Sequence, residues 1–251
     1  MAKANQVMDI CLLAGEIMLT YGAETYRVED TLERMAKSAN FSNVHCFATA
    51  TGIFLSFEAE GKDDQMQMVR IDDRLQDLNK VAEVNQISRE FVTGYISADE
   101  AQSQLQKVSV APIHYPLWFI HLSAAVAGSI FSYLFGGSLA DLLPVFFTAL
   151  IASMTMVQIE KYLKVRFFAE FTASFLGGFS AIILYTLGLG LNVDQMIIGT
   201  VMPLVPGVTL TNALRDLMSG DLIAGTSRGA EALLTSLAIA SGIALALTLT
   251  L

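Results

Sequence analysis

Apolar residues follow two different patterns in the first part of this chain. Over residues 7–21 and 24–39 they recur every three or four positions, which is the spacing of one face of an α-helix. Over residues 44–57 they alternate with polar residues. This alternation predicts a β-hairpin that turns near Thr51-Gly52, and a third strand is expected at residues 65–71 after a turn at residues 61–64.

Helical spacing returns after the strands. Apolar positions between Leu75 and Phe91 predict further helix. The sequence Ser97-Ala-Asp-Glu100 has the capping-box pattern that begins one more helix. Residues 1–111 are therefore predicted to form a small cytoplasmic α+β domain.

Long apolar stretches separated by short polar segments occupy the rest of the chain. Each stretch is close to the ~20 residues that an α-helix needs to cross the hydrocarbon core of a bilayer. Residues 112–251 are therefore predicted to form a transmembrane domain, and the fold class is a polytopic α-helical membrane protein. We expect five spans, at residues 116–135, 139–158, 167–190, 195–214 and 229–251.

The fourth predicted span is interrupted by Pro203, Pro206 and Gly207. A proline inside a helix removes a backbone donor, and its ring clashes with the carbonyl four residues earlier. Carbonyls near Gly199 and Met202 are expected to lose their usual partners. An unsatisfied backbone group in hydrocarbon costs several kcal/mol, so such a break is tolerated only inside protein or beside a water-filled cavity. Transporters build midplane binding sites from broken helices, so this segment favours transport of a small solute.

Charge is distributed unevenly along the chain. The whole sequence is 53% hydrophobic and 16% charged, but 10 of its 15 Lys and Arg residues and 17 of its 24 Asp and Glu residues precede Ala111. The first part is thus an acidic domain and the second a membrane domain. Without a basic patch to release counterions, nucleic-acid binding is excluded.

The basic residues of the membrane part predict its orientation. Lys161, Lys164 and Arg166 lie between the second and third spans, and Arg215 and Arg228 lie between the fourth and fifth. The other predicted loops contain no lysine or arginine. Under the positive-inside rule, the N-terminus is expected in the cytoplasm and the C-terminus outside a bacterial cytoplasmic (inner) membrane.

Residues that bind metals or cofactors show no recognisable spacing. Cys11 and Cys46 match no zinc pattern and are interpreted as small, reduced, buried side chains. The three histidines are likewise too scattered to form a ligand set: His45, His114 and His121. We expect no metal site and no cofactor.

The helix that restarts after Pro206-Gly207 is the candidate substrate site. Its first N–H groups and the positive end of its dipole suit a carboxylate. Hydroxyl and amide contacts are available a few residues later. The candidate substrate-binding residues are Pro203, Pro206, Gly207, Thr209, Thr211 and Asn212. The alternative interpretation is that the break only bends the helix for packing.

Charged residues in or beside the spans are candidates for proton coupling or gating, because a charge at mid-bilayer costs about 2.5–3.5 kcal/mol on insertion scales. Arg215 lies about 12 Å along a helix from Gly207, near the cytoplasmic interface. Snorkelling, or an ion pair with a neighbouring carboxylate, is an equal alternative for this residue. The candidates are Glu170, Arg215, Asp216, Asp221 and Glu231.

A polar motif near the start of the chain supplies further candidates, namely Glu24, Tyr26 and Arg27. Glu24 is expected in the first turn of the second helix, where the helix dipole favours an anion. Tyr26 and Arg27 either dock on the membrane domain or cap the cytoplasmic exit. Helix capping is the structural alternative for the motif.

Two long motifs resemble the bacterial threonine/serine exporter family. They are AGEIMLTYGAETYRVEDTLERMA, from residue 14, and MPLVPGVTLTNALRDLMSGDLIAGTSRGAEALL, from residue 202. More specifically, the chain resembles the larger, N-terminal-module subunit of the subgroup made as two separate chains. The resemblance implies a cytoplasmic domain before the membrane spans and a separate, shorter membrane partner of about four spans. A homo-oligomer is also possible.

The resemblance also implies a function, which is secondary export of small carboxylate-bearing metabolites driven by the proton motive force. Threonine and serine are the cargo of the family, and succinate or related acids that of the split members. The alternative is a regulatory or sensor subunit of a membrane complex. An enzyme is not expected, because catalytic motifs are absent and the aspartates Asp141 and Asp221 are predicted near opposite membrane faces.

Overall fold

The computed structural model describes residues 2–58, 65–72, 75–112, 115–163 and 165–250. The chain forms two compact units, one of Met1–His114 with Val208–Gly229 and one of Tyr115–Gly207 with Ala230–Leu251. The turn expected at residues 61–64 lies outside the described residues, as do His114 and Lys164.

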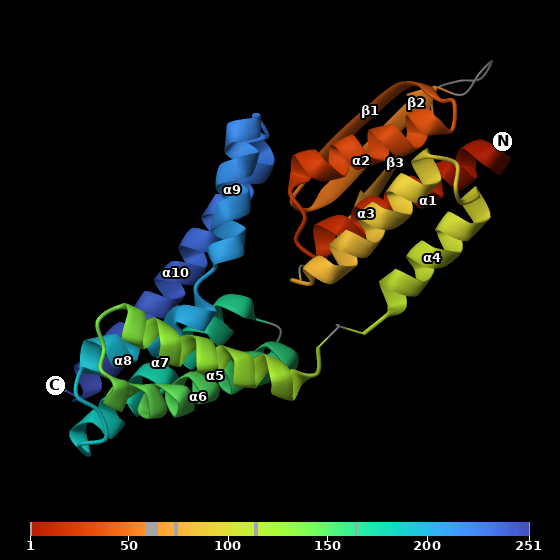
Figure 1. Cartoon of the computed structure of the whole chain (residues 1–251). Helices are drawn as coiled ribbons and strands as arrows, with labels where there is room; N and C mark the ends of the chain where they lie inside the picture. Colours follow the sequence, from red (N-terminus) through yellow and green to blue (C-terminus); the bar gives the residue numbers. More distant parts are fainter. Residues whose placement is uncertain (1, 59–64, 73–74, 113–114, 164, 251) are drawn as a thin grey trace. The chain divides into compact units, whose positions relative to one another are not determined.

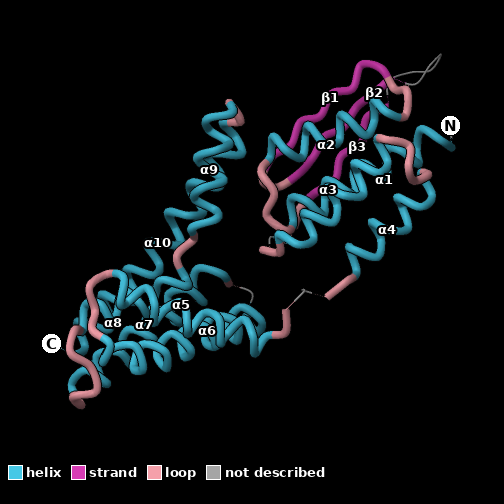
Figure 2. The backbone as a smooth tube through the Cα atoms, in the orientation of Figure 1, coloured by secondary structure: helices cyan, strands magenta, loops and turns pink. Residues whose placement is uncertain are grey.

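The first unit contains all the strands that the structure describes, as Figure 2 shows. They form one antiparallel sheet in the order β1-β2-β3, and α1 and α2 pack on it (Figure 1). Helices α3 and α4 pack in turn against α1. The elements are α1 (Ala2–Thr20), α2 (Thr25–Ser38), β1 (Ser42–Thr49), β2 (Gly52–Glu58), β3 (Gln65–Arg70), α3 (Leu78–Val92) and α4 (Ala98–Val110), joined by α9 (Gly207–Ser219) and the first residues of α10 (Leu222–Thr250).

Local sequence accounts for most of these elements. The predicted hairpin is confirmed, since Thr49 pairs with Gly52 across a tight turn. The capping box is also confirmed, because the Ser97 hydroxyl accepts from the Glu100 N–H while the Glu100 carboxylate accepts from the Ser97 N–H. Gly22, at φ 98°, ends the first helix in the left-handed conformation that glycine adopts without steric cost.

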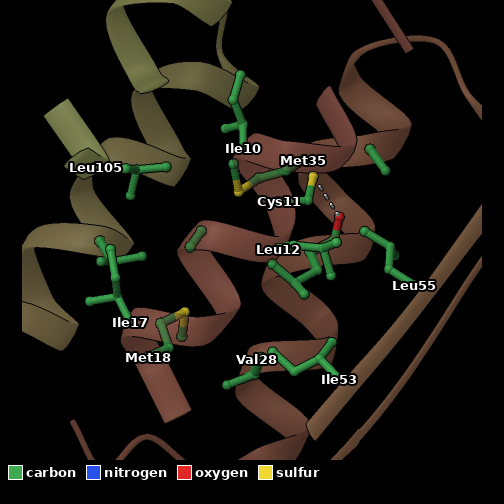
Figure 3. Close-up of a cluster of buried hydrophobic side chains, with 14 of the residues drawn as sticks. Ile10, Cys11, Leu12, Ile17, Met18, Val28, Met35, Ile53, Leu55 and Leu105 are labelled. Carbon is green, nitrogen blue, oxygen red and sulfur yellow. Dashed lines mark hydrogen bonds between the residues drawn. The ribbon is translucent and has the colours of Figure 1, made fainter. Parts of the chain in front are cut away.

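The core of the first unit is a cluster of aliphatic and sulfur-containing side chains between the helices and one sheet face (Figure 3). On β2 it takes every second residue, namely Ile53, Leu55 and Phe57, as the alternation predicted. Cys11 is fully buried there, and the loss of hydration raises the pKa of its thiol to about 12. Burial also raises the pKa of the Cys46 thiol. Both cysteines are therefore protonated and unreactive at neutral pH.

All the secondary-structure elements that the structure describes in the second unit are helices. Four helical segments are long and apolar enough to cross a membrane, and a bent helix pair makes a fifth candidate. This confirms a polytopic helical membrane protein. The elements are α5 (Leu117–Leu134), η1 (Leu139–Asp141), α6 (Leu142–Leu163), α7 (Arg166–Thr186), α8 (Val193–Val201), η2 (Met202–Leu204) and the remainder of α10.

Four of the expected span boundaries differ from the helix ends by four residues or more. Helix α6 continues to Leu163, beyond the expected 158, and α9 continues to Ser219, beyond the expected 214. Glycines set the other two boundaries. The third helix was expected to reach residue 190, but α7 ends at Thr186, and Gly188 follows at φ 75°. The last helix was expected from residue 229, but α10 begins at Leu222, directly after a turn at Gly220 with φ 92°. In both cases a left-handed glycine sets the boundary, which hydropathy alone does not locate.

Close backbone contact holds α5 against α8. A Cβ on Gly128 would lie 2.7 Å from the Gly199 carbonyl oxygen, and one on Gly199 would lie 2.6 Å from the Gly128 carbonyl oxygen. Only glycine fits at such a crossing. The Gly199 carbonyl is also the one that Pro203, four residues later, cannot bond within the helix.

Candidate functional site

The helix break forms where the prolines predict it. Helix α8 gives way to the short 3₁₀ turn η2, which contains Pro203. Val205 is extended, with φ −63° and ψ 131°, as expected for a residue that precedes a proline. Helix α9 restarts at Gly207, immediately after Pro206. The segments Val193–Leu204 and Gly207–Ser219 are bent by 62°, which defines either a broken span or a re-entrant loop.

The polar face of α9 contacts the loop between α1 and α2 within the first unit. Asp216 is fully buried, and its two carboxylate oxygens accept hydrogen bonds from the Thr25 N–H and the Thr25 hydroxyl, both at 3.2 Å. The Asn212 amide donates to the Gly22 carbonyl at 3.0 Å. These side chains, expected near a substrate or gate, are thus engaged by the Gly22–Thr25 loop.

Arginines complete this contact, which we call the loop clamp (Gly22–Thr25, Asn212, Arg215, Asp216 and Arg228). Arg228, on α10, donates to the Ala23 carbonyl at 2.9 Å and lies 3.2 Å from an Asp216 oxygen. Arg215 forms an ion pair with Glu24. This pair is the ion-pair alternative that the sequence left open for Arg215.

Glu24 holds a position different from the one expected. Glu24 is the N-cap residue of α2 and makes no side-chain capping bond, so its expected placement in the first helical turn is wrong. Its carboxylate instead pairs with Arg215 and, at 3.3 Å, with Arg27. Two full positive charges stabilise this nearly buried carboxylate more than the partial positive charge at a helix end. Tyr26 is exposed.

A second group of carboxylates lies beside the clamp. Burial and the nearby Asp216 charge raise the pKa of Asp221, whose buried Oδ2 has no hydrogen-bond partner among the described residues. Burial likewise raises the pKa of Glu29, with the Asp221 charge adding to the effect, although the Ala48 N–H donates to Glu29 and opposes the shift. Asp221 and Ala48 also line a small cavity of about 290 Å³ with Phe47. Glu29 was not among the expected site residues, since its sequence position gives no sign of this proximity.

The membrane unit has a separate charged cluster, the Arg166 cluster (Arg166, Glu170, Glu231 and Thr235). Arg166 forms an ion pair with Glu231 and lies 3.5 Å from the Glu170 carboxylate. Glu170 is 1% exposed, and its Oε1 accepts from the Thr235 hydroxyl at 3.1 Å. Glu170 Oε2 has no hydrogen-bond partner in the part of the chain that the structure describes. The structure thus brings Glu170 and Glu231 to one arginine, a grouping that sequence spacing did not indicate.

The remaining expected residues lie outside the loop clamp and the Arg166 cluster. Thr209 is half-buried and Thr211 is exposed on α9. Asp141, weighed in the enzyme hypothesis, is saturated by donors from Ser138, Leu191 and Asn192, so it fastens a loop in the membrane unit. Among the described residues there is no group of histidine, cysteine and acidic side chains that could hold a metal ion.

Comparison with known proteins gives this geometry a context. The family model described as "Putative threonine/serine exporter" matches residues 9–250. The Escherichia coli (strain K12) protein named "Probable succinate transporter subunit YjjP" is 26% identical, over 98% of this chain and 96% of that protein. No solved structure matches this chain.

Two longer relatives match over part of their length. A "Probable threonine/serine exporter" of Mycobacterium tuberculosis is 22% identical, over 97% of this chain and 46% of that protein. A "Threonine/serine exporter" of Corynebacterium glutamicum is 24% identical, over 97% of this chain and 51% of that protein. The chain therefore spans about half the length of these two exporters and nearly all of the Escherichia coli relative.

Proposed function

We propose that this chain, which belongs to the threonine/serine exporter family, is one half of a secondary active exporter of small carboxylate-bearing metabolites. The cargo is a threonine- or serine-type amino acid or a succinate-type acid, as the names of the relatives suggest. The protein lies in a bacterial inner membrane with its N-terminus in the cytoplasm and its C-terminus outside.

The observation that carries this proposal is the 62° break between Val193–Leu204 and Gly207–Ser219. An uninterrupted helix would satisfy its own backbone, whereas a broken one presents polar groups that a solute can bind. The first turn of α9 offers N–H groups and a positive dipole end to a carboxylate. Pro203, Pro206 and Gly207 shape the break, and Thr209, Thr211 and Asn212 follow it in the proposed substrate segment.

Proton coupling is assigned to the Arg166 cluster. The arginine carries one positive charge and the two carboxylates carry two negative ones. When one carboxylate takes up a proton, the cluster becomes neutral and the other carboxylate keeps its ion pair. Glu170 is the better proton carrier, because one of its oxygens is buried without a partner among the described residues. Glu231 then keeps the ion pair with Arg166.

A second membrane subunit is part of the proposal. The relative that this chain spans almost completely is named a transporter subunit, while the exporters of which it spans about half are single longer chains. A partner chain that supplies the other half would complete the pathway. A homo-oligomer is the alternative assembly.

The test is efflux of serine, threonine and succinate from loaded cells that express this chain with and without its shorter membrane partner. Efflux that requires both chains and collapses with an uncoupler supports the proposal and identifies the cargo. Efflux from this chain alone would replace the two-chain assembly with a homo-oligomer. An inserted, assembled pair that moves none of the three would contradict the proposed cargo class.

The loop clamp supports a second candidate function, that of a regulatory or sensor subunit. Four residues of α9 and α10 contact the Gly22–Thr25 loop. A conformational change in this loop is therefore transmitted directly to α9, the helix after the break. Under this alternative, Pro206→Ala leaves flux through the partner intact. Under the exporter proposal, the same substitution abolishes flux while the complex still assembles.

A further inference from the structure

A groove of about 360 Å³ lies between α2 and α3 in the first unit, and none of its lining residues belongs to the loop clamp. Three arginines line it. Arg27 and Arg34 are seven residues apart on one face of α2, and Arg89 faces them from the last turn of α3. The size of the groove is that of a site for a small molecule.

The charge of this groove is opposite to that of its surroundings. Three arginines and Asp30 give the lining a net charge of +2, although the region before Ala111 has 17 acidic residues against 10 basic ones. Arg27 lies beside Glu24 and Arg34 beside Asp30, whereas Arg89 has no ion pair among the described residues, so the lining keeps a net positive charge. The convergence of the three arginines on one concave site therefore indicates a ligand with two negative charges.

Arg89 and Arg34 are available to a ligand. No ion pair or side-chain hydrogen bond involves Arg89 within the described residues. The pair between Arg34 and Asp30 is exposed on both sides, with 69% and 52% of the side chains accessible. Exposed pairs of this kind contribute roughly 0–1 kcal/mol, so an anion can exchange for Asp30 at little cost.

Neutral polar groups complete the groove. Ser88 and Thr31 are buried and line the groove, and each hydroxyl donates to a carbonyl of its own helix. The Asn85 side chain lines the same space. A guanidinium group offers paired N–H donors to a carboxylate or phosphate, and donors from both helices suit a compact ligand held between them.

We infer that the groove between α2 and α3 binds a compact dianion, either a dicarboxylate or a phosphate group, at a ligand site of the cytoplasmic domain. Arg27 links this site to the loop clamp, since its other partner is Glu24, which also pairs with Arg215. A dianion that attracts Arg27 weakens its pair with Glu24 and leaves that carboxylate to Arg215. The inference does not depend on the proposed transport activity.

Calorimetric titration of the purified full chain in detergent tests the site, with succinate and inorganic phosphate as separate probes in a buffer that contains neither. We expect saturable binding of at least one dianion. Binding of succinate alone identifies a dicarboxylate site, and binding of phosphate alone identifies a site for phosphate-bearing ligands. Saturable binding of neither probe overturns the inference.

Variants locate the binding. Arg89→Gln and Arg34→Gln remove one charge from each wall, and each is expected to weaken binding roughly tenfold, as the loss of a hydrogen bond to a charged group predicts. Lys107→Gln, an exposed charge on α4, is the matched control and should leave the affinity unchanged. Unchanged binding in both arginine variants would show that the dianion binds elsewhere and would overturn the inference. Calorimetry measures binding and not transport. Dianion binding can therefore be detected even if the protein transports none of the tested solutes.

Discussion

Asp216 and Arg228, on the two sides of the turn between α9 and α10, form an ion pair in which Arg228 Nη1 lies 3.2 Å from Asp216 Oδ2. The Asp216 side chain is fully buried and that of Arg228 is 9% exposed. Asp216 also receives two hydrogen bonds from Thr25, and Arg228 donates to Ala23. One buried pair thus ties two helices to a loop that is nearly 200 residues away in the sequence.

Asp216→Asn is expected to destabilise the first unit by about 3–5 kcal/mol, because it leaves the Arg228 charge buried without its carboxylate. The measurement is hydrogen exchange of the amides in the Gly22–Thr25 loop, which should become markedly faster. Glu33→Gln is the matched control. It breaks an exposed pair with Lys37 and should change stability by less than about 1 kcal/mol. Equal protection of the loop in wild type and Asp216→Asn would show that the clamp does not hold it.

Gly128→Ala is expected to disrupt the packing of α5 against α8. The new methyl group would lie 2.7 Å from the Gly199 carbonyl oxygen, a backbone atom that cannot move aside as a side chain can. We expect a loss of about 1–3 kcal/mol, typical of overpacking, read as a lower melting temperature in detergent. Gly229→Ala, in α10, is the control, since a Cβ there meets no atom within 4 Å. A melting temperature equal to that of the control would contradict the close crossing.

Glu170→Gln is expected to abolish proton-driven efflux while leaving assembly intact, because it removes the proposed proton carrier but keeps the side-chain shape. Thr235→Val removes the hydroxyl that donates to Glu170 Oε1 and should slow efflux without abolishing it. Asp194→Asn, an exposed carboxylate on α8, is the control. The readout is succinate or serine efflux against an imposed pH gradient. Wild-type flux in Glu170→Gln would remove the Arg166 cluster from the coupling mechanism.

Local sequence rules predicted the type and order of the elements and the position of the helix break. The capping box at Ser97 and the hairpin at Thr49 depend on residues three positions apart, and Pro206 breaks its own helix. These features follow from the backbone within a few residues, so a single sequence reveals them.

Tertiary pairings were beyond the reach of sequence patterns. Asp216 was singled out as a charge in an apolar region, but nothing in its spacing points to Thr25 as its partner. Glu170 and Glu231 were chosen separately, and only the fold brings them to Arg166. Arg89 was not singled out at all, because the groove that gives it a role forms only where α2 packs against α3. Hydrophobic periodicity predicts which face of its own helix or strand a residue occupies. It does not predict which other element packs against that face.

Asp221→Asn is expected to stabilise the first unit at neutral pH. Burial raises the pKa of Asp221 above its ordinary 3.8, so the folded unit binds that proton more tightly than the unfolded chain. The favourable contribution of this carboxyl is fully present below pH 3.8 and is lost as the pH rises through the raised pKa. At pH 7 the ionised Asp221 side chain therefore destabilises the folded unit, and the neutral amide of asparagine removes this effect.

The melting temperature should therefore be higher in Asp221→Asn than in wild type at pH 7, and the difference should shrink as the pH falls toward 4. Because Asp221 is only partly buried, the gain is expected to be small. Glu29, whose pKa is raised in part by the Asp221 charge, should show a pKa closer to its ordinary value in this variant. Asp30→Asn, which removes an exposed carboxylate on α2, is the control and should not raise the melting temperature at pH 7. A lower melting temperature in Asp221→Asn at pH 7 would mean that the Asp221 charge stabilises the start of α10 more than its burial costs.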